Sequence, residues 1–357
     1  MTRLPDTTAP LAADEARAAF DAILDGQCAA DDIPRFLTDM SARDESATEI
    51  AAAVQAMRAR MIPVKAPEGA IDVCGTGGDG AHSLNISTAV AIVVAACEVP
   101  VAKHGNRAAS SKAGAADTLE ALGLNLDRAS EQAEATLNDL GICFLFAQKH
   151  HPALAPLAPI RKALGRRTVF NLTGPLANPA SVTRQLIGIA RPDFLPVYAE
   201  AIDQLDYETV MLVSGDEPLD EISVCGPSSC LTVKSENLTA RPEPVEGPSF
   251  ALANRKNGAS TSSAQTDFVR ITPEDIGFPR HTPDALRGGD AAYNADALRR
   301  LLAGETGAYR DAVLINAAAA LMVAGHAEDW QSGMEEAAEA IDKGLAKALL
   351  DCWIAYK

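Results

Sequence analysis

Apolar residues recur at helical spacing in three segments near the N-terminus, residues 12–24, 30–40 and 45–61. Charged residues fill the positions between them, so each segment is predicted to be an amphipathic helix. Proline and glycine interrupt the pattern between residues 63 and 69. We therefore expect a small helical domain over residues 1–68, completed by helices from about residues 150–195.

After residue 70 the pattern changes to short apolar runs that alternate with helical segments. Strands are predicted at residues 71–74, 99–102, 142–146, 207–213 and 229–233. Helices are predicted at residues 89–96, 115–122, 131–140, 308–326 and 328–350. Such alternation is typical of an α/β fold with a mainly parallel central sheet flanked by helices. We expect this larger α/β domain to span residues 69–357.

One polar stretch, residues 236–267, fits neither pattern. It is rich in Pro and Gly and contains a Ser/Thr run at residues 260–263. With little apolar periodicity to bury, it is predicted to be a flexible surface insertion.

The charge of the chain restricts its partners. The 357 residues carry 31 Lys and Arg against 48 Asp and Glu, a formal net charge of −17. Such a chain repels nucleic acid and anionic membranes at long range, so neither is an expected partner. However, residues 99–116 and 140–192 contain no acidic residue at all. If both stretches face one cleft, they form a locally positive pocket that suits a small polyanion.

Cysteine usage and the N-terminus point to the cytoplasm. Seven cysteines are scattered along the chain without a C-x-x-C pair, which argues against a disulfide framework or a zinc site. The first eleven residues contain no apolar core of a secretory signal. The longest uncharged apolar run, residues 89–97, covers about half a membrane span.

A glycine-rich loop follows the first predicted strand of the α/β domain. It reads Gly75-Thr76-Gly77-Gly78-Asp79-Gly80, and Asn85, Ser87 and Thr88 follow at the start of a helix. Glycines let a backbone approach an anion closely, and free N–H groups at a helix N-terminus favour phosphate. The spacing matches neither common nucleotide-binding pattern, so those folds are not supported. The sequence predicts a phosphate cradle of another kind.

Two further loops carry candidate chemistry. Lys103-His104-Gly105-Asn106-Arg107 ends the second predicted strand, where ligands of open α/β sheets bind; we expect His104 itself to be structural. Asp216-Glu217 and Asp220-Glu221 follow a later strand, and paired carboxylates suit Mg²⁺. Spacing alone does not decide between these two acidic pairs.

Taken in order, these motifs resemble those of the anthranilate phosphoribosyltransferase family over most of the chain. The matching segments are residues 75–79 (pyrophosphate loop), 85–88, 103–107, 151–153 with Arg161 and 171–179 (aromatic-substrate channel), and 219–223 (metal motif). The metal motif selects the second acidic pair. The resemblance implies that the amine of anthranilate attacks C1 of phosphoribosyl pyrophosphate, releasing pyrophosphate, in tryptophan biosynthesis. It also implies a homodimer and the use of Mg²⁺, with two ions in each subunit.

Matching positions imply the roles of individual residues. Phosphoribosyl pyrophosphate would contact Gly75, Gly78, Asp79, Ser83, Asn85, Ser87, Thr88, Lys103, Gly105, Asn106, Arg107 and Ala115. Anthranilate would contact Gly75, Asn106 and Arg161, and metal would bind Ser87, Asp220 and Glu221. No general acid or base is assigned, because a neutral aromatic amine can attack directly. Ala115 departs from the pattern, since many family members have Ser there.

Two alternatives share this fold. A pyrimidine nucleoside phosphorylase would use phosphate as the nucleophile, but its Lys-His segment continues differently and it gives Asp220-Glu221 no purpose. A non-catalytic, nucleic-acid-binding relative would have a basic surface, which a net charge of −17 opposes.

Overall fold

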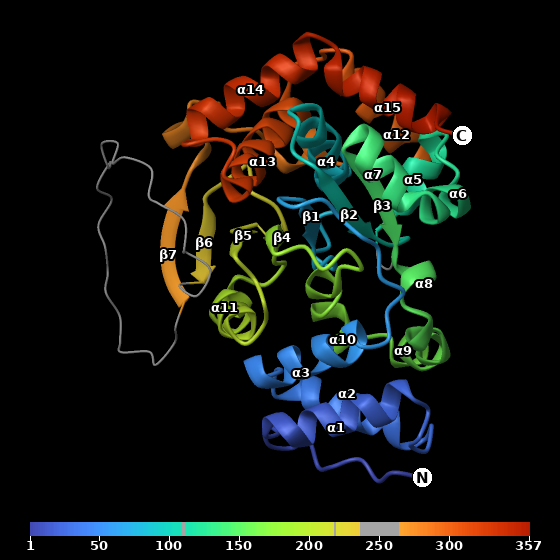
Figure 1. The fold of residues 1–357 in the computed structure, drawn as a ribbon. Helices are drawn as coiled ribbons and strands as arrows, with labels where there is room; N and C mark the ends of the chain where they lie inside the picture. Colours follow the sequence, from blue (N-terminus) through green and yellow to red (C-terminus); the bar gives the residue numbers. More distant parts are fainter. Residues whose placement is uncertain (109–110, 218, 236–263) are drawn as a thin grey trace.

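The computed structural model describes residues 1–108, 111–217, 219–235 and 264–357. A small helical domain lies at one end of the molecule (Figure 1) and is built on α1 (Ala13–Leu24), α2 (Asp32–Ala42) and α3 (Ala47–Arg58). Two later helices, α9 (Ala158–Leu164) and α10 (Val169–Leu172), pack against α2. The ring of Phe20 meets those of Phe36 and Phe170 edge to face, with centroids 5.8 and 6.1 Å apart.

Seven strands of the described residues form one sheet in the order β3-β2-β1-β4-β5-β6-β7. They are β1 (Ile71–Gly75), β2 (Val101–Gly105), β3 (Ile142–Phe146), β4 (Arg184–Gly188), β5 (Thr209–Gly215), β6 (Ser228–Ser235) and β7 (Ala264–Ile271). The strands β1 to β5 run parallel, whereas β6 and β7 are antiparallel to their neighbours. The predicted α/β class with a mainly parallel sheet is confirmed.

Helices cover both faces of this sheet (Figure 1). One face packs against α4 (Ile86–Ala96) and α13 (Ala308–Ala324), and the other carries α11 (Leu195–Asp203) and α3. Alternation along β4 shows both contacts, because Leu186 joins the α4–α13 core and Ile187 joins the α3–α11 core. The remaining helices are α5 (Ala115–Leu122), α6 (Leu126–Glu131), α7 (Ala133–Leu140), α8 (Ala147–His150), α12 (Ala291–Leu302), α14 (Trp330–Asp342) and α15 (Leu345–Ala355).

Several predicted boundaries need correction. The strand β4 falls inside residues 150–195, the range expected to complete the helical domain, but it is hydrogen-bonded between β1 and β5. The expected insertion 236–267 lies outside the described residues up to residue 263, and its last four residues are the first half of β7. Residues 328–350 contain two helices, separated at Gly344, where φ is +72°.

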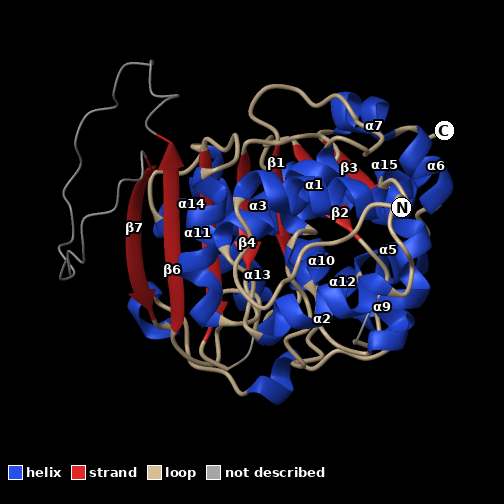
Figure 2. Cartoon of the chain, turned by 90° about the horizontal axis from the view of Figure 1, so that it is seen from below, coloured by secondary structure: helices blue, strands red, loops and turns tan. Residues whose placement is uncertain are grey.

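The carboxyl ends of the parallel strands face the helical domain. Past β3, His150 Nδ1 bonds to the carbonyl of Ile62 at 3.0 Å, and past β4, Arg191 pairs with Asp44 in the turn between α2 and α3 at 2.8 Å. In Figure 2, which views the molecule from the helical side, α1 and α3 lie in front of the strands. Among the described residues, no helix is long and apolar enough to cross a membrane.

Candidate active site

The loop that carries Asp220 crosses the carboxyl ends of β1 and β4. A Cβ atom at Gly75 would lie 2.2 Å from Asp220 Oδ2, and one at Gly188 would lie 1.5 Å from the Asp220 carbonyl oxygen. A side chain at Gly188 would therefore displace the loop backbone, and one at Gly75 would displace the Asp220 side chain. The N–H of Gly77 donates to Asp220 Oδ2 at 2.7 Å. These contacts bring the glycine-rich loop and the second acidic pair together.

The two acidic pairs lie in different surroundings. Asp216 forms an ion pair with Arg270, and Glu217 accepts a hydrogen bond from the Ser223 hydroxyl. Glu221, in contrast, faces the start of α4, where it accepts a hydrogen bond from the Ser87 N–H. The first pair thus has protein partners for its charge, while the second pair lies beside the glycine-rich loop and the N-terminus of α4.

The surroundings of the second pair fit a divalent cation. Burial and the neighbouring Asp79 carboxylate raise the pKa of Asp220 to about 7, and burial together with Asp220 raises the pKa of Glu221 well above its usual range. Neighbouring carboxylates in a buried site repel one another unless a proton or a cation lies between them. Hard oxygen donors of this kind are those that Mg²⁺ prefers. Within the described residues, no group of three or more possible metal-binding side chains is assembled.

The N-terminus of α4 carries three predicted residues. Asn85 is the residue before the helix, and Ser87 and Thr88 lie in its first turn. Thr88 is 1% exposed, and its hydroxyl has no hydrogen-bond partner among the described residues. Lys103, on the adjacent strand β2, is 2% exposed and places its Nζ 3.4 Å from Ser87 Oγ and 2.7 Å from the Val73 carbonyl. A buried ammonium thus lies next to the helix end expected to bind an anion.

The glycine-rich loop itself depends on left-handed backbone. Gly77 and Gly78 have φ values of +66° and +78°, which side chains rarely adopt. The Asp79 carboxylate accepts a hydrogen bond from the Ala81 N–H at 3.1 Å and closes the following turn. Further along, Ser83 forms an antiparallel bridge with Arg287, so the loop is supported from the C-terminal part of the chain.

Arg107, in the loop after β2, is expected to contact the substrate but is bound to acidic side chains in the structure. Its guanidinium pairs with Asp117 at 2.8 Å and Glu120 at 2.9 Å on α5, so its charge is already matched. Asn106 Oδ1 accepts from the Arg107 N–H at 2.8 Å. Ala115 begins α5, and its Cβ lies 3.2 Å from the position that a Cβ on Gly105 would take. This loop is therefore tightly packed against α5.

Arg161 is a half-buried cation on α9. Its guanidinium lies over the Phe170 ring, 5.8 Å from the centroid, and its Nη2 is 3.5 Å from Asn171 Oδ1. Burial lowers its pKa, and no carboxylate in the described part of the chain forms an ion pair with it. Asn106 bonds instead to Gln148 Nε2 at 3.4 Å, so the structure places these two predicted aromatic-substrate residues on separate elements.

His104 has the surroundings of a structural histidine. It is 6% exposed, its Nδ1 bonds to the Gly174 carbonyl at 3.1 Å, and its ring lies 5.2 Å from that of His151. Burial lowers the pKa of His104 to about 3, so the imidazole is neutral at pH 7. Because a carbonyl oxygen only accepts, Nδ1 carries the proton.

Two buried polar residues that support the site, Asp72 and Asn294, are not among those predicted from the sequence. Asp72, fully buried on β1, accepts from the His104 N–H at 3.1 Å and from Asn178 Nδ2 at 2.8 Å. Asn294, on α12, donates to Asn85 Oδ1 at 2.9 Å. A polar residue inside an otherwise apolar strand or helix face is the signal that identifies both, since burying it requires partners.

Comparisons with known proteins agree with this geometry. The model of the glycosyl transferase family helical bundle domain matches residues 4–61, and that of the family's a/b domain matches residues 67–347. The anthranilate phosphoribosyltransferase of Novosphingobium aromaticivorans is 61% identical over 99% of both chains. The anthranilate phosphoribosyltransferase structure from Thermus thermophilus matches with a TM-score of 0.82 and 36% identity, covering 98% of this chain and 96% of that one.

A Saccharomyces cerevisiae anthranilate phosphoribosyltransferase, solved in complex with PRPP and Mg, matches with a TM-score of 0.81 and 25% identity over 97% of this chain and 93% of that one. The family resemblance predicted from the motifs is confirmed. The chain therefore belongs to the anthranilate phosphoribosyltransferases, glycosyltransferase-family enzymes of tryptophan biosynthesis.

Proposed function

We propose that the carboxyl edge of the sheet is where this chain transfers the phosphoribosyl group of phosphoribosyl pyrophosphate to the amine of anthranilate, giving N-(5-phosphoribosyl)anthranilate and pyrophosphate. One observation supports placing the reaction at this site. The glycine-rich loop, the N-terminus of α4, buried Lys103 and the Asp220-Glu221 pair meet at one edge of the sheet. That combination suits a substrate with several phosphate oxygens.

The phosphoribosyl donor binds along the loops that follow β1 and β2. The Gly75–Asp79 segment and the first turn of α4 offer backbone N–H groups and hydroxyls to its phosphates, and the unpartnered Thr88 hydroxyl is one such group. Lys103 supplies positive charge from β2, next to Ser87 at the start of α4. The complete proposed set is Gly75, Gly78, Asp79, Ser83, Asn85, Ser87, Thr88, Lys103, Gly105, Asn106, Arg107 and Ala115; of these, Arg107 must leave its acidic partners to take part.

Anthranilate binds on the side of the helical domain. Arg161 is half-buried without a carboxylate partner among the described residues, so the carboxylate of anthranilate supplies the missing charge. Gly75 and Asn106 complete the proposed contacts. His104, two residues before Asn106, and His151 are neutral and add no competing positive charge.

The reaction needs positioning and charge stabilisation more than proton transfer. The aromatic amine is neutral at pH 7 and attacks C1 with its own lone pair while the bond from C1 to the pyrophosphate oxygen breaks. Negative charge grows on the leaving pyrophosphate, where Lys103 and the N–H groups of the glycine-rich loop stabilise it. Holding the amine in line with that bond, through Arg161, supplies a large part of the rate.

Ser87, Asp220 and Glu221 are the residues that hold magnesium in this proposal, with two ions in each subunit when substrate is bound. Bound there, magnesium supplies positive charge to the pyrophosphate oxygens. Burial and the neighbouring Asp79 carboxylate raise the pKa values of both carboxyl groups, and this disfavoured charge supports the assignment.

We also propose that the chain works in the cytoplasm as a homodimer. All seven cysteines are free thiols, as expected in a reducing compartment. The dimer, through the helical domain, rests on the family resemblance. Light scattering tests it: the dimer has twice the chain's mass of 37.3 kDa.

A fluorescence assay tests the proposed reaction. Purified protein mixed with anthranilate, phosphoribosyl pyrophosphate and Mg²⁺ is expected to remove anthranilate fluorescence, and omitting either the donor or the metal is expected to stop the loss. Activity with a pyrimidine nucleoside and phosphate instead would favour the phosphorylase alternative. A gel shift with single-stranded DNA tests the nucleic-acid-binding alternative.

A further inference from the structure

The side chain of Asn85 is oriented by segments outside its own helix. An asparagine just before a helix ordinarily accepts from the helix's first N–H groups, but Asn85 makes no such bond. Its Oδ1 accepts instead from the Thr118 hydroxyl and from Asn294 Nδ2, the latter at 2.9 Å. Its Nδ2 donates to the Ala113 carbonyl at 3.3 Å. Neighbouring elements therefore set the direction of this amide.

Asn294 has its own orientation fixed by the backbone. It lies in the first turns of α12, is 2% exposed, and is followed by apolar residues of the same buried helix face. The N–H of Gly289, which can only donate, bonds to Asn294 Oδ1 at 2.8 Å. The NH₂ group of Asn294 must then point toward Asn85, and the atom that it meets there must be an acceptor.

This relay decides which end of Asn85 faces the substrate. With Oδ1 held by Asn294 and Thr118, the NH₂ group of Asn85 lies on the other side. One of its two hydrogens is used by the Ala113 carbonyl, and the second is available to a ligand. An anionic phosphate oxygen needs a donor, whereas an amide carbonyl in the same place would repel it.

The segment before α12 is fastened to the loop that leads to Asn85. The Leu84 N–H bonds to the Leu286 carbonyl at 2.9 Å, and the Gly288 N–H bonds to the His82 carbonyl at 2.8 Å. A Cβ at Gly288 would lie 2.6 Å from the Ser83 carbonyl oxygen, so the two segments are in close contact. These contacts therefore fix the position of Asn294 relative to Asn85.

We propose that Asn294 is a positioning residue for the phosphoribosyl donor: through the Gly289–Asn294–Asn85 relay it fixes Asn85 as a hydrogen-bond donor to that substrate. The inference rests on the proposed function, in which Asn85 contacts the donor.

Asn294→Asp tests the relay with little change of shape. The new carboxylate still accepts from Gly289 but cannot donate to Asn85, so the Asn85 amide turns over and presents its carbonyl to the substrate. We expect the KM for phosphoribosyl pyrophosphate to rise about ten- to hundredfold. The KM for anthranilate is expected to change much less. Thr118→Val removes the other hydrogen bond to Asn85 Oδ1, and a smaller rise for the same substrate is expected even if the first variant does not fold.

Leu298→Ala is the matched structural control. Leu298 lies one turn further along α12, is fully buried and contacts the apolar core. Its truncation is expected to lower the melting temperature and to leave both KM values near those of the wild type.

Combination with Asn85→Ala separates the possible outcomes. If Asn294 acts through Asn85, Asn294→Asp adds no further rise to the donor KM in the Asn85→Ala background. A full additional effect there, or equal rises for both substrates, would overturn the relay. An Asn85→Ala variant with an unchanged donor KM would refute the proposed contact itself. A raised donor KM in Asn85→Ala with unchanged values in both Asn294→Asp and Thr118→Val would overturn the positioning role alone.

Discussion

At the scale of single residues, two acidic pairs four positions apart show what the fold adds to spacing. The sequence predicts that one of them binds metal, but an Asp-Glu pair looks the same whether it faces solvent or a substrate. The structure separates them, because the Asp220 segment lies against Gly75 and Gly188 at the ends of the strands, and the Asp216 segment does not. Which loop residues turn inward depends on strands far apart in the chain, so it cannot be read from local pattern.

Asp220→Asn combined with Glu221→Gln is expected to lose on the order of a hundredfold or more in turnover, because charge on the leaving pyrophosphate is no longer neutralised. The Mg²⁺ concentration for half-maximal activity is expected to rise. The variant should fold normally, since burial already disfavours the charged form of both carboxyl groups and raises their pKa. Mg²⁺ titration at saturating phosphoribosyl pyrophosphate measures the effect.

The matched control is Asp216→Asn with Glu217→Gln. These side chains bond to Arg270 and Ser223, so their loss is expected to lower stability slightly and to leave the Mg²⁺ dependence unchanged. The assignment of the metal residues would be contradicted if the control variant lost most of its turnover. It would also be contradicted if the Mg²⁺ dependence changed in neither variant.

Arg161→Ala is expected to raise the KM for anthranilate about ten- to hundredfold, the usual effect of losing a charged hydrogen bond. The KM for the phosphoribosyl donor should stay nearly constant. Steady-state kinetics with each substrate varied in turn measures the difference. Lys162→Ala, the exposed neighbouring cation, is the control and should change neither value. Equal rises for both substrates would show instead that Arg161 has a structural role.

At the scale of elements, the sequence predicts the apolar strands and misses the polar ones. The central strand β4 contains Gln185, which is fully buried and donates to Asp72 at 3.2 Å, so its apolar run is too short to recognise. The edge strand β7 carries Asp267 and Arg270 and exposes Phe268. The strands β4 and β7 form because they pair with neighbouring strands, and this pairing leaves no periodic pattern in the local sequence.

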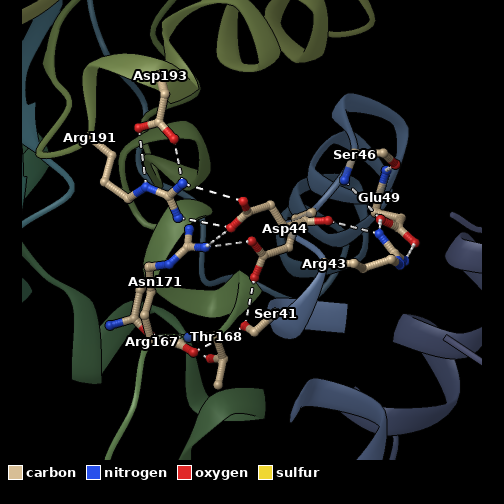
Figure 3. Close-up of polar contacts among 11 residues, drawn as sticks. Ser41, Arg43, Asp44, Ser46, Glu49, Arg167, Thr168, Asn171, Arg191 and Asp193 are labelled. Atoms are coloured by element: carbon tan, nitrogen blue, oxygen red, sulfur yellow. Dashed lines mark hydrogen bonds and ion pairs between the residues drawn. The ribbon is translucent and has the colours of Figure 1, made fainter. Parts of the chain in front are cut away.

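Elements far apart in the chain meet in an ion-pair network around the turn between α2 and α3 (Figure 3). Arg167, between α9 and α10, pairs with Asp44 at 3.2 Å and with Glu45 at 2.9 Å. Arg191, after β4, also pairs with Asp44, and both arginines lie over the Phe194 ring. The Glu45 side chain is fully buried, whereas Asp44 is about half exposed. The network therefore contains one buried charge, whose desolvation costs free energy, and several exposed charges that solvent screens.

Arg167→Ala is expected to lower the free energy of unfolding by about 3 kcal/mol, because it leaves the buried Glu45 carboxylate without its cation. Asp44→Ala, which removes only exposed pairs, should cost less than about 1 kcal/mol. Urea denaturation measures both values. Adding Glu45→Gln to Arg167→Ala removes the unpaired charge and should restore part of the loss. Equal costs for the two single variants would refute this account of the network.

At the scale of the whole molecule, the sequence predicts two domains but not how they are joined. The junction uses neutral histidines: His104 on β2 bonds to the Gly174 carbonyl, and His150, at the end of α8, bonds to the Ile62 carbonyl. His151 packs against the His104 ring. The rings lie where the strand ends meet segments of the helical side, and none of their Nε2 atoms has a hydrogen-bond partner among the described residues. Their protonation would place positive charge inside this junction.

Acid is therefore expected to weaken the ligand-free protein through these residues. Burial lowers the pKa of His104 to about 3 and that of His151 to about 4, below the usual value of 6.5. Between these values and 6.5 the unfolded chain binds more protons than the folded one, so stability is complete above pH 6.5 and falls as the pH decreases. At pH 5 each histidine should cost about 2 kcal/mol relative to pH 7.5.

His104→Asn isolates one of these contributions. Asparagine keeps an N–H donor for the Gly174 carbonyl but does not titrate, so any loss of packing lowers stability equally at every pH. The free energy of unfolding, measured by urea denaturation at several pH values from 5 to 7.5, should fall less steeply toward acid in the variant, by about 2 kcal/mol over that range. Parallel curves for wild type and variant would mean that His104 takes up its proton in the folded state as readily as in the unfolded chain, and that the junction tolerates the charge.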